Sequence, residues 1–395
     1  MDPYVSEWLN LVVRWIHVIT GVAWIGASFY FNWLEGHLER NKSLPNGVAG
    51  DLWAVHGGGF YHVQKYEVAP QALPKTLHWF KWEAYTTWLS GMVLLFIVYY
   101  MVPEVYLIDS TVADLSPAMA MVISLGTLLI GWLGYHQLCK TTLTAKPTLF
   151  FCVLFLSLTA IAFFLSQLLN PRAAYIHTGA LIGTLMVGNV FFVIIPSQHT
   201  LVNALMAGNR PDPHVGKQGF TRSLHNNYFT LPVLFIMVSN HFPVTFTHTM
   251  NWLVLAALSA IGIAVRHYFN LKNKGRNARW LLPAAALATL VLAFVIRPQT
   301  TSSTITTTVT TPQAFTIVQT HCRQCHSAQP TDAHFQTAPN GVTFDTEADL
   351  ERQATQIYAR TVATQSMPLG NATHMSLAER EMLGRWYQSI QQRDE

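Results

Sequence analysis

Long apolar segments separated by short polar connections occupy the first three quarters of the chain. A helix needs about 20 predominantly apolar residues to cross the hydrocarbon core of a bilayer. Trp and Tyr gather near the ends of these segments, as they do at membrane interfaces. The pattern therefore predicts an all-α transmembrane bundle. Its eight expected spans are at about 9–34, 82–103, 117–139, 147–169, 174–196, 229–246, 250–270 and 279–297.

Basic residues lie in alternate connections, and this asymmetry predicts an orientation. The first, third, fifth and seventh connections carry Lys and Arg, whereas the others carry only Arg172. By the positive-inside rule the basic connections are cytoplasmic, so both termini are expected in the periplasm of a bacterial inner membrane. The N-terminus lacks the basic stretch and cleavage site of a secretory signal, so the first span is expected to remain as an anchor.

The last quarter of the chain is more polar and predicts a separate small domain. Residues 298–312 are rich in Thr and Ser and have no pattern that would bury a face, which indicates a solvated linker. The expected organisation is a membrane domain over 1–297, this linker, and a small C-terminal domain of the class I cytochrome c type over 313–395.

The segment Cys322-Arg-Gln-Cys325-His326 is the attachment signature of a c-type haem. Each thiol can form a thioether to a haem vinyl group, and the imidazole of His326 can ligate the iron. The alternative is half of a zinc site, which needs a second Cys or His pair at a suitable spacing. Cys139 and Cys152, the remaining cysteines, lie in apolar segments far upstream.

The sixth iron ligand is expected downstream of the signature. Met367 fits best because Pro368 fixes the backbone beside it, and a methionine ligand raises the haem potential relative to a second histidine. Met375 and His374 are the rival candidates, although they lie just before a capping box at Ser376-Leu-Ala-Glu that opens the last helix.

The last helix has apolar residues at helical spacing, so it is expected to pack on the helix that holds Phe315. These residues are Leu383, Trp386, Tyr387 and Ile390.

Composition agrees with a membrane protein. Hydrophobic residues make up 51% of the chain and charged residues only 11%, against about a quarter in soluble proteins. The formal net charge of +4 comes largely from the predicted cytoplasmic connections and does not indicate nucleic-acid binding.

Many of the 17 histidines lie at or within the spans. His17 is deep in the first span and His177 lies near the outer end of the fifth, which makes them candidate ligands of a b-type haem. The alternative is that histidines at span ends only anchor the helices at the interface.

A parallel repeat of four spans plus four is a further hypothesis. It pairs His78 with His225 and His136 with His267, and would gather these four histidines on the cytoplasmic side.

The cytoplasmic connections also contain candidate anion-binding residues. His56 precedes three glycines, which permit backbone N–H groups to converge on an anion. Lys and His beside aromatic rings can hold a planar anionic heterocycle, and amides can bind ring edges. The alternative for the first connection is an amphipathic helix on the lipid headgroups. The candidate binding residues are His56, Lys65, Lys81, Trp82, Asn226 and Asn227.

At these residues the sequence resembles the bacterial membrane-bound, cytochrome c-containing urate oxidases, also called urate hydroxylases. The resemblance covers nearly the whole chain. It rests on Trp24-Ile-Gly26, Gly57-Gly-Gly-Phe-Tyr61, Lys65-Tyr66, Trp79-Phe-Lys-Trp-Glu83-Ala-Tyr85, Gly188-Asn189-Val-Phe, Ile194-Ile-Pro-Ser-Gln198, His225-Asn-Asn-Tyr-Phe-Thr-Leu-Pro232, Ser239-Asn240-His241 and the haem signature.

The resemblance implies oxidation of urate to 5-hydroxyisourate. Electrons would pass to the c-type haem and then to a soluble cytochrome c or a terminal oxidase. A base must accept protons from urate and from the attacking water, and histidine has a suitable pKa range. The candidate bases are His78, His136, His225 and His267, with Glu83 as an alternative.

The sequence is also compatible with two rival functions. A non-catalytic subunit that takes electrons from quinol, or a transporter with an appended cytochrome, has the same overall organisation. The cytoplasmic candidates and the outer haem are separated by a hydrocarbon layer of about 30 Å, which favours a pocket within the bundle and a relay near His17 and His177. A homodimer is the expected oligomer, from the small residues along the bundle.

Overall fold

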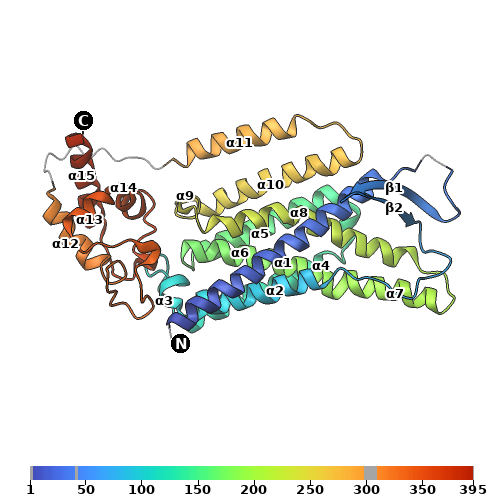
Figure 1. The fold of residues 1–395 in the computed structure, drawn as a ribbon, viewed down its shortest axis with the longest axis horizontal. Helices are drawn as coiled ribbons and strands as arrows, with labels where there is room; N and C mark the ends of the chain where they lie inside the picture. Colours follow the sequence, from blue (N-terminus) through green and yellow to red (C-terminus); the bar gives the residue numbers. More distant parts are fainter. Residues whose placement is uncertain (1–2, 41–42, 298–308, 395) are drawn as a thin grey trace.

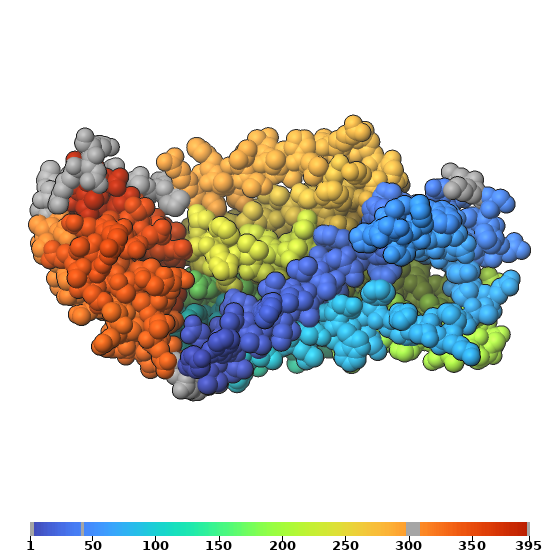
Figure 2. All heavy atoms as spheres, in the orientation of Figure 1, coloured from blue at the N-terminus to red at the C-terminus, as the bar shows by residue number. Residues whose placement is uncertain are grey.

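The computed structural model describes residues 3–40, 43–297 and 309–394. It consists of a long helical bundle and a small helical domain that covers one end of it (Figures 1 and 2). The N-terminus and the C-terminal domain lie at this same end, which is called the outer end below; the opposite end is the inner end.

The bundle contains the helices expected from the apolar pattern. Its main helices are α1 (Pro3–His37), α2 (Trp82–Leu95), α4 (Pro117–Leu138), α5 (Pro147–Ser166), α6 (Pro171–Asn189), α7 (Ile195–Met206), α8 (Pro213–Ser239), α10 (Asn251–Asn273) and α11 (Leu281–Val295). Each predicted span overlaps one of them. By length and composition, five helices of the described residues can cross a membrane: α1, α4, α5, α10 and the continuous α6–α7 unit.

Two helices continue through a π-helical turn. η1 (Phe96–Tyr100) extends α2, and η3 (Val190–Ile194) joins α6 to α7. α6 lies at the centre of the bundle, where most of its side chains are buried. It packs against α4, α5 and α8.

Local sequence signals set where several helices begin. Proline occupies the first turn of α4, α5, α6 and α8, where its missing N–H is not needed. Ser116, Asn170 and Asp212 each precede such a proline, and their side chains accept a hydrogen bond from a first-turn N–H.

A β-hairpin corrects the all-α expectation. β1 (Val48–His56) pairs antiparallel with β2 (Gly59–Tyr66) at the inner end of the bundle (Figure 1). Gly57 and Gly58 form the turn with positive φ values of 56° and 80°, so the glycine run closes a hairpin. Leu52 on β1 packs against Leu34 in the last turns of α1 and against Leu38, which follows the helix.

Two short helices lie at the outer end. They are α3 (Pro103–Tyr106) and α9 (Pro243–Phe246). α3 contacts the C-terminal domain.

The C-terminal domain is built from short helices around a core of its own. Its elements are α12 (Thr311–His321), η4 (Pro339–Gly341), α13 (Glu347–Arg352), α14 (Ala354–Ile357), η5 (Tyr358–Ala363), η6 (Leu369–Asn371) and α15 (Leu377–Asp394). Leu383 and Trp386 are fully buried against α12, which confirms the predicted packing of the last helix on the helix of Phe315.

The start of this domain lies slightly before the predicted boundary. Thr310 caps α12 through a capping box with Gln313, so helical structure begins at Thr311. Most of the predicted linker, residues 298–308, lies outside the described residues.

Candidate functional site

The two cysteines of the predicted haem signature lie in a tight turn after α12. The N–H groups of Cys325 and His326 both donate to the carbonyl oxygen of Cys322, at 3.2 and 2.9 Å. Both thiols are free. Burial raises the pKa of Cys322 to about 12 and that of Cys325 to about 11, so both are protonated at neutral pH. Because neither cysteine forms a disulfide, both are available for thioether bonds.

The geometry of His326 fits a metal ligand. Its Nδ1 lies 3.0 Å from the carbonyl oxygen of Val342. A carbonyl only accepts hydrogen bonds, so Nδ1 carries the proton and Nε2 keeps its lone pair. Histidines that bind metals are commonly oriented by this kind of hydrogen bond.

The backbone of Met367 is held on both sides. Its N–H donates to the carbonyl oxygen of Arg360 at 3.0 Å, and its carbonyl accepts from Arg380 at 2.8 Å. The buried guanidinium of Arg380 also donates to Thr361 and Asn371. Met367 is therefore positioned by three segments of the domain.

The two rival candidates for the sixth iron ligand lie in environments that differ from that of Met367. Met375 is 3% exposed and belongs to the apolar core of the domain. His374 is exposed and adopts a positive φ of 56°. These positions favour Met367.

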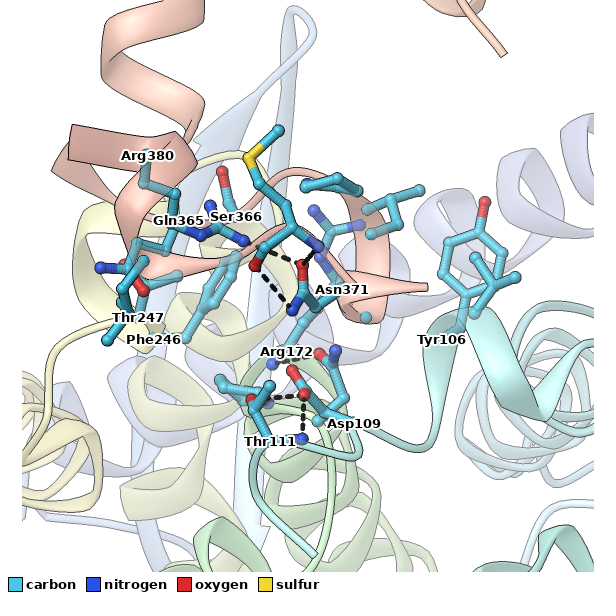
Figure 3. A pocket seen from close by; sticks show the side chains of 18 residues that line it. Tyr106, Asp109, Thr111, Arg172, Phe246, Thr247, Gln365, Ser366, Asn371 and Arg380 are labelled. Atoms are coloured by element: carbon cyan, nitrogen blue, oxygen red, sulfur yellow. Dashed lines mark hydrogen bonds between the residues drawn. The ribbon is translucent and has the colours of Figure 1, made fainter. Parts of the chain in front are cut away.

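The loop after Met367 rests on the outer end of the bundle. A Cβ at Gly370 would lie 3.1 to 3.2 Å from the carbonyl oxygens of Glu104, Val105 and Ile108. Beside this contact is a cavity of about 290 Å³. Figure 3 shows that the bundle contributes Arg172 and Phe246 to its wall, and the C-terminal domain contributes residues such as Asn371.

Tyr106 of α3 lines the cavity at the junction with the C-terminal domain (Figure 3). Burial raises the pKa of its hydroxyl; Arg172 opposes this effect, while Cys325 and Asp332 of the C-terminal domain add to it.

Aromatic rings continue from Tyr106 into the bundle. The ring centroid of Tyr99 is 6.3 Å from that of Tyr106 and 5.5 Å from that of His177. Tyr99 is 5% exposed and His177 is fully buried. These three residues form a continuous aromatic path from the junction toward the interior of the bundle.

The two candidate ligands of a b-type haem share one feature. Nδ1 of His17 lies 2.9 Å from the carbonyl oxygen of Thr87, and Nδ1 of His177 lies 2.7 Å from that of Ala173. Each ring therefore leaves Nε2 free for a ligand, and Nε2 of His177 is buried without a hydrogen-bond partner among the described residues. His17 packs against Gly91, whereas His177 packs against Tyr99.

A buried polar cluster occupies the inner half of the bundle between α4, α6 and α8. The hydroxyl of Tyr135 is 2.8 Å from Nδ1 of His225. Asn189 donates to Tyr135 and to Asn226, at 2.9 and 2.8 Å. Its carbonyl oxygen accepts from Arg222 at 3.1 Å.

A second polar cluster lies between α8 and α10. Oδ1 of Asn227 accepts from Nε of Arg266 and from Nδ2 of Asn270, both at 2.9 Å. The guanidinium of Arg266 also lies over the ring of Phe29, 4.1 Å from its centroid. Nδ2 of Asn227 and Oδ1 of Asn270 are buried without partners in the described part of the chain.

Both clusters contain a buried cation without a counter-ion. Arg222 and Arg266 are 7% and 5% exposed, and neither forms an ion pair with a carboxylate among the residues described. A buried charge is costly unless it is paired. An anionic ligand beside either guanidinium would supply the missing charge.

The structure brings together only part of the predicted site. His225, Asn226 and Asn227 join the clusters, and the sequence reasoning missed Tyr135, Asn189, Arg222, Arg266 and Asn270. A signal for Arg222 alone was present, because Arg222, His225 and Phe229 recur at helical spacing.

The other candidate histidines lie at separate points. His136 packs against Trp132, with ring centroids 5.2 Å apart. Nδ1 of His267 lies within hydrogen-bond distance of the hydroxyl of Tyr228, at 2.7 Å. His78 is exposed in the segment before α2, and Glu83 lies in the first turn of that helix. No group of three or more metal-ligating side chains occurs among the described residues.

The remaining binding candidates are also outside the clusters. His56 is exposed at the tip of the hairpin, and Lys65 pairs with Glu35 of α1. Lys81 lies over the ring of Trp82, 5.6 Å from its centroid.

The family model described as "Urate oxidase N-terminal" matches residues 3–297, which include the whole bundle and both polar clusters. No curated protein and no solved structure matches the chain.

Proposed function

Because the chain belongs to the urate oxidase N-terminal family, we propose that it oxidises urate to 5-hydroxyisourate in the bundle and passes the electrons to a c-type haem on its C-terminal domain. The observation that carries this proposal is the pair of buried guanidiniums, Arg222 and Arg266, that lack carboxylate partners in the described structure.

Urate suits these two clusters. At neutral pH it is a flat monoanion with carbonyl and N–H groups around its edge. Guanidinium groups bind such anions through fixed N–H donors, and the amides of Asn226 and Asn227 both donate and accept. A urate anion would therefore satisfy the charge of Arg222 or Arg266 and the unpaired amide of Asn227.

His225 is the proposed base. It lies in the same cluster as Arg222, and the hydroxyl of Tyr135 fixes its ring through Nδ1. With substrate and product both written as neutral acids, the oxidation is urate plus water to 5-hydroxyisourate, two protons and two electrons. His225 would accept a proton from urate or from the attacking water, and Tyr135 would hold the ring in the required orientation.

The C-terminal domain provides the electron exit. His326 and Met367 would hold the iron, and Cys322 and Cys325 would attach the macrocycle. A c-type haem accepts one electron at a time, so each urate requires two transfers. The aromatic path of His177, Tyr99 and Tyr106 supports a route toward the haem signature.

A b-type haem held by His17 or His177 would shorten that route. The free Nε2 of each ring supports ligation. A pyridine haemochrome assay of the full-length protein, which counts b- and c-type haems per chain, tests this part of the proposal. The downstream acceptor would be a soluble cytochrome c or a terminal oxidase, and the protein would act as a homodimer in the inner membrane.

The proposal is tested by mixing the purified full-length protein with urate in the absence of oxygen. We expect prompt appearance of the reduced c-haem absorption, with one urate consumed per two haems reduced. Reduction by quinol while urate has no effect would instead assign the protein as an electron-transfer subunit. Cys322→Ala should impair covalent haem attachment, which haem staining of denaturing gels would show.

A further inference from the structure

A second cavity lies on the side of the bundle between α5, α8 and α10, away from the outer junction. Its volume is about 690 Å³. Most of its wall is apolar, and small side chains of α10 such as Ala256 and Ala260 leave the space open. Ala260 is exposed at the bundle surface, so the cavity opens toward the surrounding lipid.

The cavity is long and follows the helix axes. On α10 its wall extends from Trp252 to His267, which is roughly 22 Å at 1.5 Å per residue. Near the outer end, Phe163 makes an edge-to-face contact with Trp252 at 5.2 Å between centroids. The shape suits an extended apolar chain lying along the bundle.

The inner end of the cavity is polar. The hydroxyl of Tyr228 lies 2.7 Å from Nδ1 of His267, and both side chains line the cavity. Farther along, the hydroxyls of Thr159 and Thr178 donate to backbone carbonyls of their own helices. The Tyr228–His267 pair therefore forms a polar group at the inner end of the cavity to which a ligand can hydrogen-bond.

The same polar end adjoins both buried clusters. Tyr228 follows Asn227 on α8, and His267 follows Arg266 on α10. Phe151 lines the cavity and connects it to the first cluster, with its ring centroid 5.2 Å from that of His225 and 5.4 Å from that of Tyr228.

We propose that this cavity binds an isoprenoid quinone, with the quinone ring at Tyr228 and His267 and the tail along α5 and α10. A quinone carries carbonyl oxygens that accept hydrogen bonds from hydroxyl and imidazole groups, and it needs no cation. A phospholipid would require a cation for its phosphate, and no Lys or Arg among the described residues lines the cavity.

The redox consequence rests on the proposed function. Urate, water and quinone would give 5-hydroxyisourate and quinol: the two electrons and two protons that leave urate and water reduce the two quinone carbonyls to hydroxyls. The quinone would be a second electron exit on the inner side, in parallel with the c-type haem.

The test measures binding without urate, so its outcome is independent of the proposed function. Full-length protein in lipid nanodiscs would be titrated with decylubiquinone, a quinone with a short saturated tail. We expect saturable binding at one site per chain. Ala260→Trp fills the cavity and should weaken binding at least tenfold. Val122→Trp, at a position of α4 that is 65% exposed, is the matched control and should leave the affinity unchanged.

Tyr228→Phe removes one hydroxyl and keeps the ring. The loss of one neutral hydrogen bond should weaken quinone binding by roughly threefold to tenfold. The proposal is overturned if the unchanged protein shows no saturable binding. It also fails if Ala260→Trp, with its haem spectrum and size-exclusion profile intact, binds decylubiquinone as tightly as the Val122→Trp control. Co-purification of a phospholipid that decylubiquinone cannot displace would assign the cavity to lipid instead.

Discussion

The guanidinium of Arg380 donates a 2.8 Å hydrogen bond to the carbonyl oxygen of Met367, the predicted axial ligand. Arg380→Lys keeps the charge but loses the planar fork that reaches three segments. We expect a lower haem reduction potential and a domain that is less stable by about 1.5–3 kcal/mol for each lost charge-assisted bond. Redox titration and thermal melts of the haem absorption measure both effects.

Arg360→Lys is the control for this substitution, because Arg360 is exposed and contacts Met367 through its backbone alone. It should leave the potential unchanged. Equal potentials in the two variants would contradict a positioning role for Arg380.

Gly370 holds the C-terminal domain against α3. Gly370→Ala would place a Cβ 3.1 to 3.2 Å from three carbonyl oxygens of the bundle, at a φ of 57°. We expect the docking to loosen and urate-driven haem reduction to slow, with urate affinity unaffected. Stopped-flow absorption under anaerobic conditions measures the rate.

Gly341→Ala separates docking from backbone strain. Gly341 has a similar φ of 67° and nothing within 4 Å of an added Cβ. Both variants incur about 1–2 kcal/mol of left-handed strain, but only Gly370→Ala disturbs the junction. The docking interpretation is wrong if both slow the reaction equally.

Asn227 offers a way to test the unpaired charge of Arg266. Its Oδ1 accepts two hydrogen bonds and its Nδ2 has no partner in the described structure, so Asn227→Asp loses no donor contact. The new carboxylate would neutralise Arg266 and compete with an anionic substrate. We expect a tenfold to hundredfold higher KM for urate, on the order of the 1.5–3 kcal/mol of one charge-assisted hydrogen bond.

The KM for urate is measured by steady-state kinetics for Asn227→Asp and for the control Asn209→Asp. Asn209 is exposed in the connection before α8, so its change adds the same charge outside the clusters. An unaltered KM in Asn227→Asp would place the substrate elsewhere.

The hydrogen bonds of Glu379 predict that the stability of the C-terminal domain depends on pH. Hydrogen bonds from Ser376, and then His321, lower the pKa of its carboxyl to about 2. A carboxyl with a lowered folded-state pKa stabilises the fold above its unfolded pKa, near 4.5, and this contribution is lost as the pH falls toward 2.

Glu379→Gln keeps the capping box and removes the charge. Its melting temperature should be below that of the unchanged protein at pH 7, and the difference should shrink below pH 4.5 and vanish near pH 2. Glu379→Ala also loses the hydrogen bonds from Ser376 to the side chain of residue 379, so it should remain less stable than the unchanged protein at every pH. If the melting temperatures of Glu379→Gln and the unchanged protein differ by the same amount at every pH, the charge of the Glu379 carboxylate is not the source of the difference.

The sequence was sufficient for the bundle helices because their apolar runs are long. It failed at α8, which begins at Pro213, far before the predicted span at 229–246. Arg222, His225, Asn226 and Asn227 looked like a connection because they are polar. They are helical and buried because α4, α6 and α10 supply their hydrogen-bond partners, and such long-range pairing is not visible in one sequence.

The hairpin was missed for a related reason. Its three glycines suggested an anion-binding loop, but Gly57 and Gly58 serve the positive φ of a turn. By contrast, the cytochrome-like features were local. The Ser376–Glu379 capping box is confirmed by reciprocal hydrogen bonds, and Cys322, Cys325 and His326 stand in one turn of the chain, where spacing alone carries the prediction.

α11 and α12 belong to one covalent chain, and this connection determines the reaction order of the proposed electron transfer. Under the proposed function, donor and acceptor share one polypeptide, so electron delivery to the outer domain would be a first-order process whose rate does not fall on dilution. A separately added copy of that domain would compete only near millimolar concentration, the usual scale for groups joined by a short segment.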